Sequence, residues 1–143
     1  MKGASIILLI YMTLLSTSVI TDLKNDKIYN AAVIPFMLLG LATGMFSYGL
    51  TGLGDSLISM VVTLGILIPV FLIRGIGAGD VKLFVALAAF LPVQGMISCI
   101  VCSFFIGACI SVAAFLAEGT KRKTIHFAVP IFLSGVLYSL GKI

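Results

Sequence analysis

Charged residues are scarce in this chain. Lys, Arg, Asp and Glu together make up 10% of the 143 residues, and only five of these residues are acidic. Soluble domains carry about 25% charged residues, and a soluble 15.1 kDa domain would expose far more surface than so few charges can cover. Apolar residues make up 61% of the chain, and the mean hydropathy is +1.27. The composition excludes a soluble domain and predicts an integral membrane protein.

Metal ligands are also few. The chain has one histidine, His126, and its three cysteines all lie in one apolar run (Cys99, Cys102 and Cys109). The stretch CIVC has metal-like spacing, but a zinc site needs two further ligands. We therefore expect the cysteines to be packing residues and the protein to need neither a metal nor a cofactor.

Six apolar runs are separated by short polar breaks. They cover residues 4–21, 31–50, 55–73, 80–92, 94–117 and 125–141. A membrane-spanning helix needs about 20 apolar residues, so the fourth run, which ends near Pro92, is short. The pattern predicts an all-α polytopic bundle of about six transmembrane helices; four or five long helices with a re-entrant piece are the alternative.

No linker, repeat or separate soluble segment remains, so we expect residues 1–143 to form a single membrane-embedded domain. The first run lacks a small-residue cleavage site before the charged break, and it is expected to stay in the mature protein as a helix.

Basic residues predict the orientation. Seven of the nine lie in or next to the breaks that follow the first, third and fifth runs: Lys24, Lys27, Arg74, Lys82, Lys121, Arg122 and Lys123. The positive-inside rule places these breaks in the cytoplasm and both termini outside the cell membrane. The net charge of +4 is then a signal of topology, and we expect no nucleic-acid partner.

Two aspartates lie at helix boundaries on this cytoplasmic side. Asp22 ends the first predicted helix and Asp80 begins the fourth, so a bundle would bring them to one face. Ionisable groups near the membrane are costly and mark functional sites. Gly75, Gly77 and Gly79 precede Asp80 at alternate positions, and glycine permits close approach of another chain. This spacing predicts a carboxylate displayed beside an extended substrate.

The other two aspartates have simpler interpretations. Asp26 lies in the middle of the first polar break. Asp55 begins the third apolar run on the opposite side, where we expect it to cap the helix N-terminus.

The segments around Asp22 and Asp80 carry a family resemblance. The stretch GAGD at 77–80 resembles the G-x-G-D motif of membrane-embedded aspartyl proteases, and GAGDVKLF at 77–84 resembles the second catalytic segment of the type IV prepilin peptidase family. DLKNDKIYN at 22–30 resembles the first segment, and IHFAVPIFLSGVLY resembles the family's last helix. Tyr29 stands where the family usually has proline, whereas Asp22, Ile28 and Asn30 match.

The resemblance implies an aspartyl endopeptidase acting within the membrane or at its surface. Asp22 and Asp80 would be catalytic, and four residues would support the site or the substrate: Asn30, Gly77, Gly79 and Lys82. The substrate would be a prepilin or pseudopilin precursor, whose basic leader is cleaved from an apolar helix at the cytoplasmic face.

The chain resembles the small members of the family, including those that serve tight-adherence pili, more than it resembles the larger members. The chain lacks the cytoplasmic domain with two CxxC pairs, so the resemblance implies a peptidase without methyltransferase activity. The partners implied are the precursor and the bilayer; a homo-oligomer is left open.

Two carboxylates that share a site cannot both ionise easily. The helix dipole predicts that Asp80, at a helix start, is the charged base and that Asp22, at a helix end, is the protonated acid. Lys82 would stabilise the charge of Asp80 if its side chain folds back.

Two alternatives stay open. One is a preflagellin-type G-x-G-D peptidase. The other is a small transporter or channel, in which acidic residues are expected near the bilayer midplane on broken helices; here both aspartates lie at helix ends.

Overall fold

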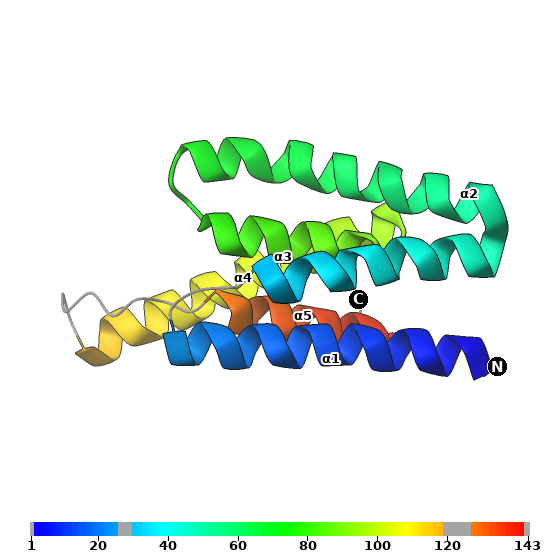
Figure 1. Ribbon diagram of the computed structural model, residues 1–143. Helices are drawn as coiled ribbons and strands as arrows, with labels where there is room; N and C mark the ends of the chain where they lie inside the picture. The colour runs from blue at the N-terminus through cyan, green and yellow to red at the C-terminus, as the bar shows by residue number, and fades with distance from the viewer. Residues whose placement is uncertain (1, 26–29, 119–126, 142–143) are drawn as a thin grey trace.

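The computed structural model describes residues 2–25, 30–118 and 127–141, and every regular element within these ranges is an α-helix. The helices are α1 (Lys2–Asn25), α2 (Asn30–Leu72), α3 (Ala78–Ala88), α4 (Val93–Glu118) and α5 (Ala128–Ser139). They run up and down in one bundle (Figure 1). The prediction of an all-α bundle is confirmed.

Helix α2 is broken near its middle by Gly49. This residue has φ 68° and ψ −146°, a backbone conformation open to glycine and strained for other residues. The chain reverses there, so that the two arms of α2 run antiparallel (Figure 1). A Cβ on Gly52 would collide with the carbonyl oxygen of Gly44, so the arms touch backbone to backbone beside the break. The two arms correspond to the second and third predicted helices. With α2 counted as two arms, the described part of the chain has six helical segments.

The break corrects the expectation for Asp55. Helical backbone resumes directly after Gly49, so Asp55 lies inside the second arm, where it is exposed, and does not cap its N-terminus.

Within the described ranges, three helices are long and apolar enough to cross a membrane. The qualifying stretches are Ile7–Lys24 of α1, Val33–Leu72 of α2 and Val93–Ala117 of α4. The α2 stretch has 40 residues, about twice the length that one crossing needs. Helix α3 has 11 residues and α5 has 12, so both are short of a full crossing. The fourth predicted helix is thus shorter than expected, because it ends at Ala88 rather than near Pro92.

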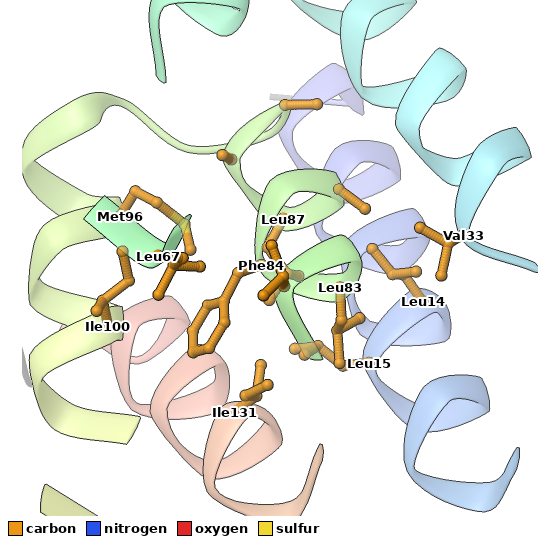
Figure 2. Packing of buried hydrophobic residues seen from close by; sticks show 14 of the residues in the cluster. Leu14, Leu15, Val33, Leu67, Leu83, Phe84, Leu87, Met96, Ile100 and Ile131 are labelled. Atoms are coloured by element: carbon orange, nitrogen blue, oxygen red, sulfur yellow. The ribbon is translucent and has the colours of Figure 1, made fainter. Parts of the chain in front are cut away.

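The short helix α3 lies at the centre of the core. Its residues Leu83, Phe84 and Leu87 are almost completely buried. Figure 2 shows them between Leu14 and Leu15 of α1 on one side and Met96, Ile100 and Ile131 of α4 and α5 on the other. The surrounding helices carry the exposed apolar side chains, which suit contact with lipid. The core therefore fixes α3, and with it the side chains of its first turn.

The bundle has two distinct ends. One end of the bundle holds the last turn of α1, the end of α2 and the start of α3, and we call it the Asp80 end (Figure 1). The other holds the reversal of α2, the turn between α3 and α4 and the end of α5; because Gly49 is the residue at that reversal, we call it the Gly49 end. Asp22 and Asp80 therefore lie at the same end of the bundle.

Candidate active site

The loop before α3 begins with a compact turn that closes α2. The N–H of Arg74 donates to the carbonyl of Phe71 (2.9 Å), and the N–H of Gly75 donates to the carbonyl of Val70 (2.8 Å). This pair of bonds is the Schellman motif, in which glycine usually takes the left-handed position. Here Arg74 takes it, with φ 60°. Gly75 is required by space, because a Cβ there would lie 2.9 Å from Cγ1 of Val70 and 3.1 Å from its carbonyl oxygen.

The first turn of α3 positions Asp80. Gly77 is the N-cap, with φ −78° and ψ 154°, and its N–H donates to Oδ2 of Asp80 at 3.3 Å. A Cβ on Gly77 would lie 3.1 Å from the same oxygen. Glycine at this position therefore supplies a backbone donor and leaves room for the carboxylate. Gly79 lies in the same turn, and Lys82 lies on the exposed side of α3.

Asp22 lies in the last turn of α1, and its side chain is only 9% exposed. Its negative charge acts on Asp80, so the two carboxylates lie within interaction range of one another. Two acidic residues that are 58 positions apart are thus close in the fold, as the sequence predicted.

The environment of Asp80 disfavours its charged form. Burial is the main reason that the pKa of Asp80 rises from 3.8 to about 6; the hydrogen bond from Gly77 lowers the pKa, and the charge of Asp22 raises it. The N–H donor at the N-terminus of α3 lowers the pKa of Asp80, as expected, but desolvation raises this pKa by more. The expectation that the helix start would keep the pKa of Asp80 low is therefore wrong in direction.

A pocket of about 530 Å³ opens beside Asp80. One wall is the loop and the start of α3, and the other is formed by α4 and the beginning of α5. The lining residues are Arg74, Gly75, Ile76, Gly77, Asp80, Phe104, Gly107, Ala108, Ser111 and Phe127.

The wall formed by α4 was missed in the sequence. Gly107, Ala108 and Ser111 are small residues within one turn of α4, and a Cβ on Gly107 would lie 2.7 Å from the ring of Phe127. The cluster of small residues in the fifth apolar run is the signal that would have indicated this wall, since small side chains let another chain approach closely.

Other predicted residues lie elsewhere. Asn30 begins α2, and its side chain is outside the described part of the structure, as are Asp26 and His126. Cys99 is buried, Cys102 is half-buried and Cys109 is exposed. The described ranges contain no group of three His, Cys, Asp or Glu side chains placed to hold a metal ion.

Comparison with known proteins identifies the family but no individual relative. No curated protein and no solved structure matches the chain. The model of the type IV leader peptidase family matches residues 8–112, which include both aspartate segments and the loop between α2 and α3. The chain therefore belongs to the type IV leader peptidase family, a family of peptidases.

Proposed function

We propose that Asp22 and Asp80 are the catalytic pair of an aspartyl endopeptidase that removes basic leaders from prepilin or pseudopilin precursors. One observation carries this proposal: Asp80 combines a raised pKa, a nearby second carboxylate and an open pocket at one end of the bundle. Perturbed carboxyl pairs in a cleft are characteristic of acid–base catalysis. Membership of a peptidase family supports the same reaction class.

The pair works by sharing one proton. Asp22, as the charged base, takes a proton from a water molecule, and the resulting hydroxide attacks the carbonyl carbon of the scissile peptide. Asp80 gives its proton to the carbonyl oxygen, so that a neutral tetrahedral diol forms. When the C–N bond breaks, one diol proton returns to Asp80 and Asp22 transfers its proton to the leaving nitrogen. The raised pKa of Asp80 supports its assignment as the acid.

The supporting residues have distinct proposed roles. Gly77 and Gly79 keep the approach to Asp80 open so that an extended substrate can lie beside the carboxylate. Lys82 and Asn30 are proposed on the resemblance of their segments to the family motifs. The small-residue wall of α4 would receive the apolar part of the precursor next to its cleavage site.

We further propose that the Asp80 end faces the cytoplasm, that both termini lie outside and that residues 1–143 act as one domain in the cell membrane. Lys24, Arg74 and Lys82 all belong to segments at the Asp80 end, which agrees with the positive-inside rule. A reporter that is active only outside the cytoplasm should be active when fused after residue 143 and inactive when fused at residue 120. The reverse pattern would contradict this orientation.

Co-expression with candidate precursors encoded nearby tests the function. Prepilins, pseudopilins and a preflagellin should be compared, because each would report a different substrate class. A prepilin or pseudopilin should show a mobility shift that is lost in the double variant Asp22→Asn/Asp80→Asn. Mass spectrometry of the product should show a free N-terminus without an added methyl group. Processing of the preflagellin alone would favour the alternative peptidase, and a methylated product made by the purified enzyme would contradict the peptidase-only assignment.

A further inference from the structure

Helix α1 carries five hydroxyl residues between Thr13 and Thr21, and one of them behaves differently from the rest. Four donate to backbone carbonyls three or four residues earlier: Thr13, Ser16, Thr17 and Thr21. Ser18 is fully buried, and its hydroxyl has no hydrogen-bond partner. A buried hydroxyl without a partner is unfavourable, and alanine would suit the site better on packing grounds alone. Ser18 therefore needs an explanation beyond packing.

The position of Ser18 on α1 supplies that explanation. Ser18 lies four residues before Asp22, and the spacing places both side chains on the same buried face with Cβ atoms about 5–6 Å apart. Helical side chains lean toward the helix N-terminus, so the carboxylate of Asp22 leans toward Ser18. The neighbouring Leu14 and Leu15 are completely buried and apolar.

We infer that Ser18 is a positioning residue for Asp22, and that its hydroxyl donates a hydrogen bond to the Asp22 carboxylate when that group is charged. A change of χ1 rotamer, or one intervening water molecule, would complete the contact. The bond would orient the carboxylate toward the attacking water and favour its charged form. This inference rests on the proposed function, because it assigns Ser18 to the base of that reaction.

Few charged groups face this part of α1. Helix α3 contributes Asp80 and the exposed Lys82, and α1 itself contributes Lys24, which is exposed. The only charged residue of α2 is Asp55, toward the Gly49 end, and α5 has none, with Tyr138 as its one titratable side chain. Within the described ranges, the Ser18 hydroxyl is the buried neutral donor one turn from Asp22.

The chain offers a matched control in Ser59. This serine is also fully buried, its hydroxyl also lacks a partner, and it also lies four residues from an aspartate, the exposed Asp55. It differs from Ser18 in its distance along the bundle from the Asp80 end. Ser59→Ala therefore measures what loss of a buried hydroxyl does when no catalytic carboxylate is one turn away.

Cleavage of a precursor by the full-length enzyme in detergent tests the inference across a pH series. Ser18→Ala should lower kcat about tenfold with KM unchanged, and should move the acidic limb of the pH–activity profile upward by about half a pH unit, because the charged base loses a donor. Ser59→Ala should leave both the rate and the profile unchanged.

A second pair of variants removes the effect of volume. Ser18→Thr and Ser18→Val have nearly the same shape, and only the threonine keeps a hydroxyl. The threonine variant should retain the wild-type acidic limb, and the valine variant should show the upward shift. An unmoved limb in Ser18→Val, or an equal shift in Ser59→Ala, would overturn the inference. Such results would leave the proposed function intact, because that depends on wild-type cleavage and its loss in the aspartate variants.

Discussion

The two ends of the bundle reverse the chain in different ways. At the Gly49 end, the turn between the arms of α2 uses a glycine at φ 68°, the residue that this conformation favours. At the Asp80 end, the turn after α2 uses Arg74 at φ 60°, the only residue other than glycine with positive φ in the described part of the chain. A left-handed conformation at a residue with a Cβ costs about 1–2 kcal/mol.

The aspartates near the two ends of the bundle also differ, both in burial and in pKa. Asp55 is exposed, beside a pocket of about 360 Å³ near the Gly49 break. Asp80 is partly buried, and its pKa is raised to about 6. The turn at the Gly49 end uses the residue that its backbone conformation favours, whereas the Asp80 end retains a strained arginine and a desolvated carboxylate. Local instability of this kind gathers at functional sites.

The largest expected effect is the loss of precursor cleavage when individual aspartates are replaced by asparagine. Asp22→Asn and Asp80→Asn should each lower precursor cleavage at least about 1,000-fold, because neither amide can exchange the proton that the reaction transfers. Asp55→Asn and Asp26→Asn should stay within about twofold of wild type. All four variants should reach the membrane in equal amounts, as checked by immunoblotting of membrane fractions. An inactive Asp26→Asn enzyme would show that the first catalytic aspartate had been wrongly assigned.

The next effect concerns stability and pH. The folded-state pKa of Asp80 lies above its ordinary value of 3.8, so between about pH 4 and 6 the folded protein holds a proton that the unfolded chain loses. Stability should therefore fall as pH rises through this window, by at most about 3 kcal/mol. Thermal unfolding in detergent should show this slope in wild type and a flatter profile in Asp80→Asn. Identical slopes in the two proteins would contradict the desolvation of Asp80.

Much of this arrangement could be predicted from the sequence. Apolar runs and glycine-rich breaks located the helical segments, and the alternation of direction brought Asp22 and Asp80 to one end. The exact break in α2 could not be predicted, because Gly44, Gly49, Gly52 and Gly54 all lie in the same stretch and each is compatible with a turn.

The electrostatics of the site could not be predicted either. The helix position of Asp80 was visible in the sequence, but the desolvation that outweighs it depends on packing between α3 and distant segments. The α4 wall and the orphaned hydroxyl of Ser18 have the same origin, because both are set by which helix faces meet in the bundle.

A smaller effect is expected when one glycine near each end of the bundle is replaced by alanine. Gly77→Ala would place a Cβ 3.1 Å from Oδ2 of Asp80, so the carboxylate must shift by a few tenths of an ångström, and kcat/KM should fall about tenfold. Gly54→Ala adds a methyl group where no atom lies within 4 Å, inside the second arm of α2. It should leave cleavage unchanged and add about 0.5–1 kcal/mol of stability. Full activity in Gly77→Ala would show that this spacing beside Asp80 is not needed for catalysis.

The smallest effect tests the strained arginine itself. Arg74→Gly should raise the free energy of unfolding by about 1 kcal/mol, because glycine suits the left-handed position of the Schellman turn. Cleavage should nevertheless fall several-fold, because the Arg74 side chain lines the pocket beside Asp80. Arg74→Asn separates the two effects, since asparagine tolerates the left-handed conformation but lacks the charge. At the other end Gly49→Ala should do the reverse, lowering stability by more than about 1 kcal/mol while kcat of the folded fraction stays unchanged. An Arg74→Gly enzyme that is more stable and fully active would remove Arg74 from the site, and the strain at this end would then have no functional explanation.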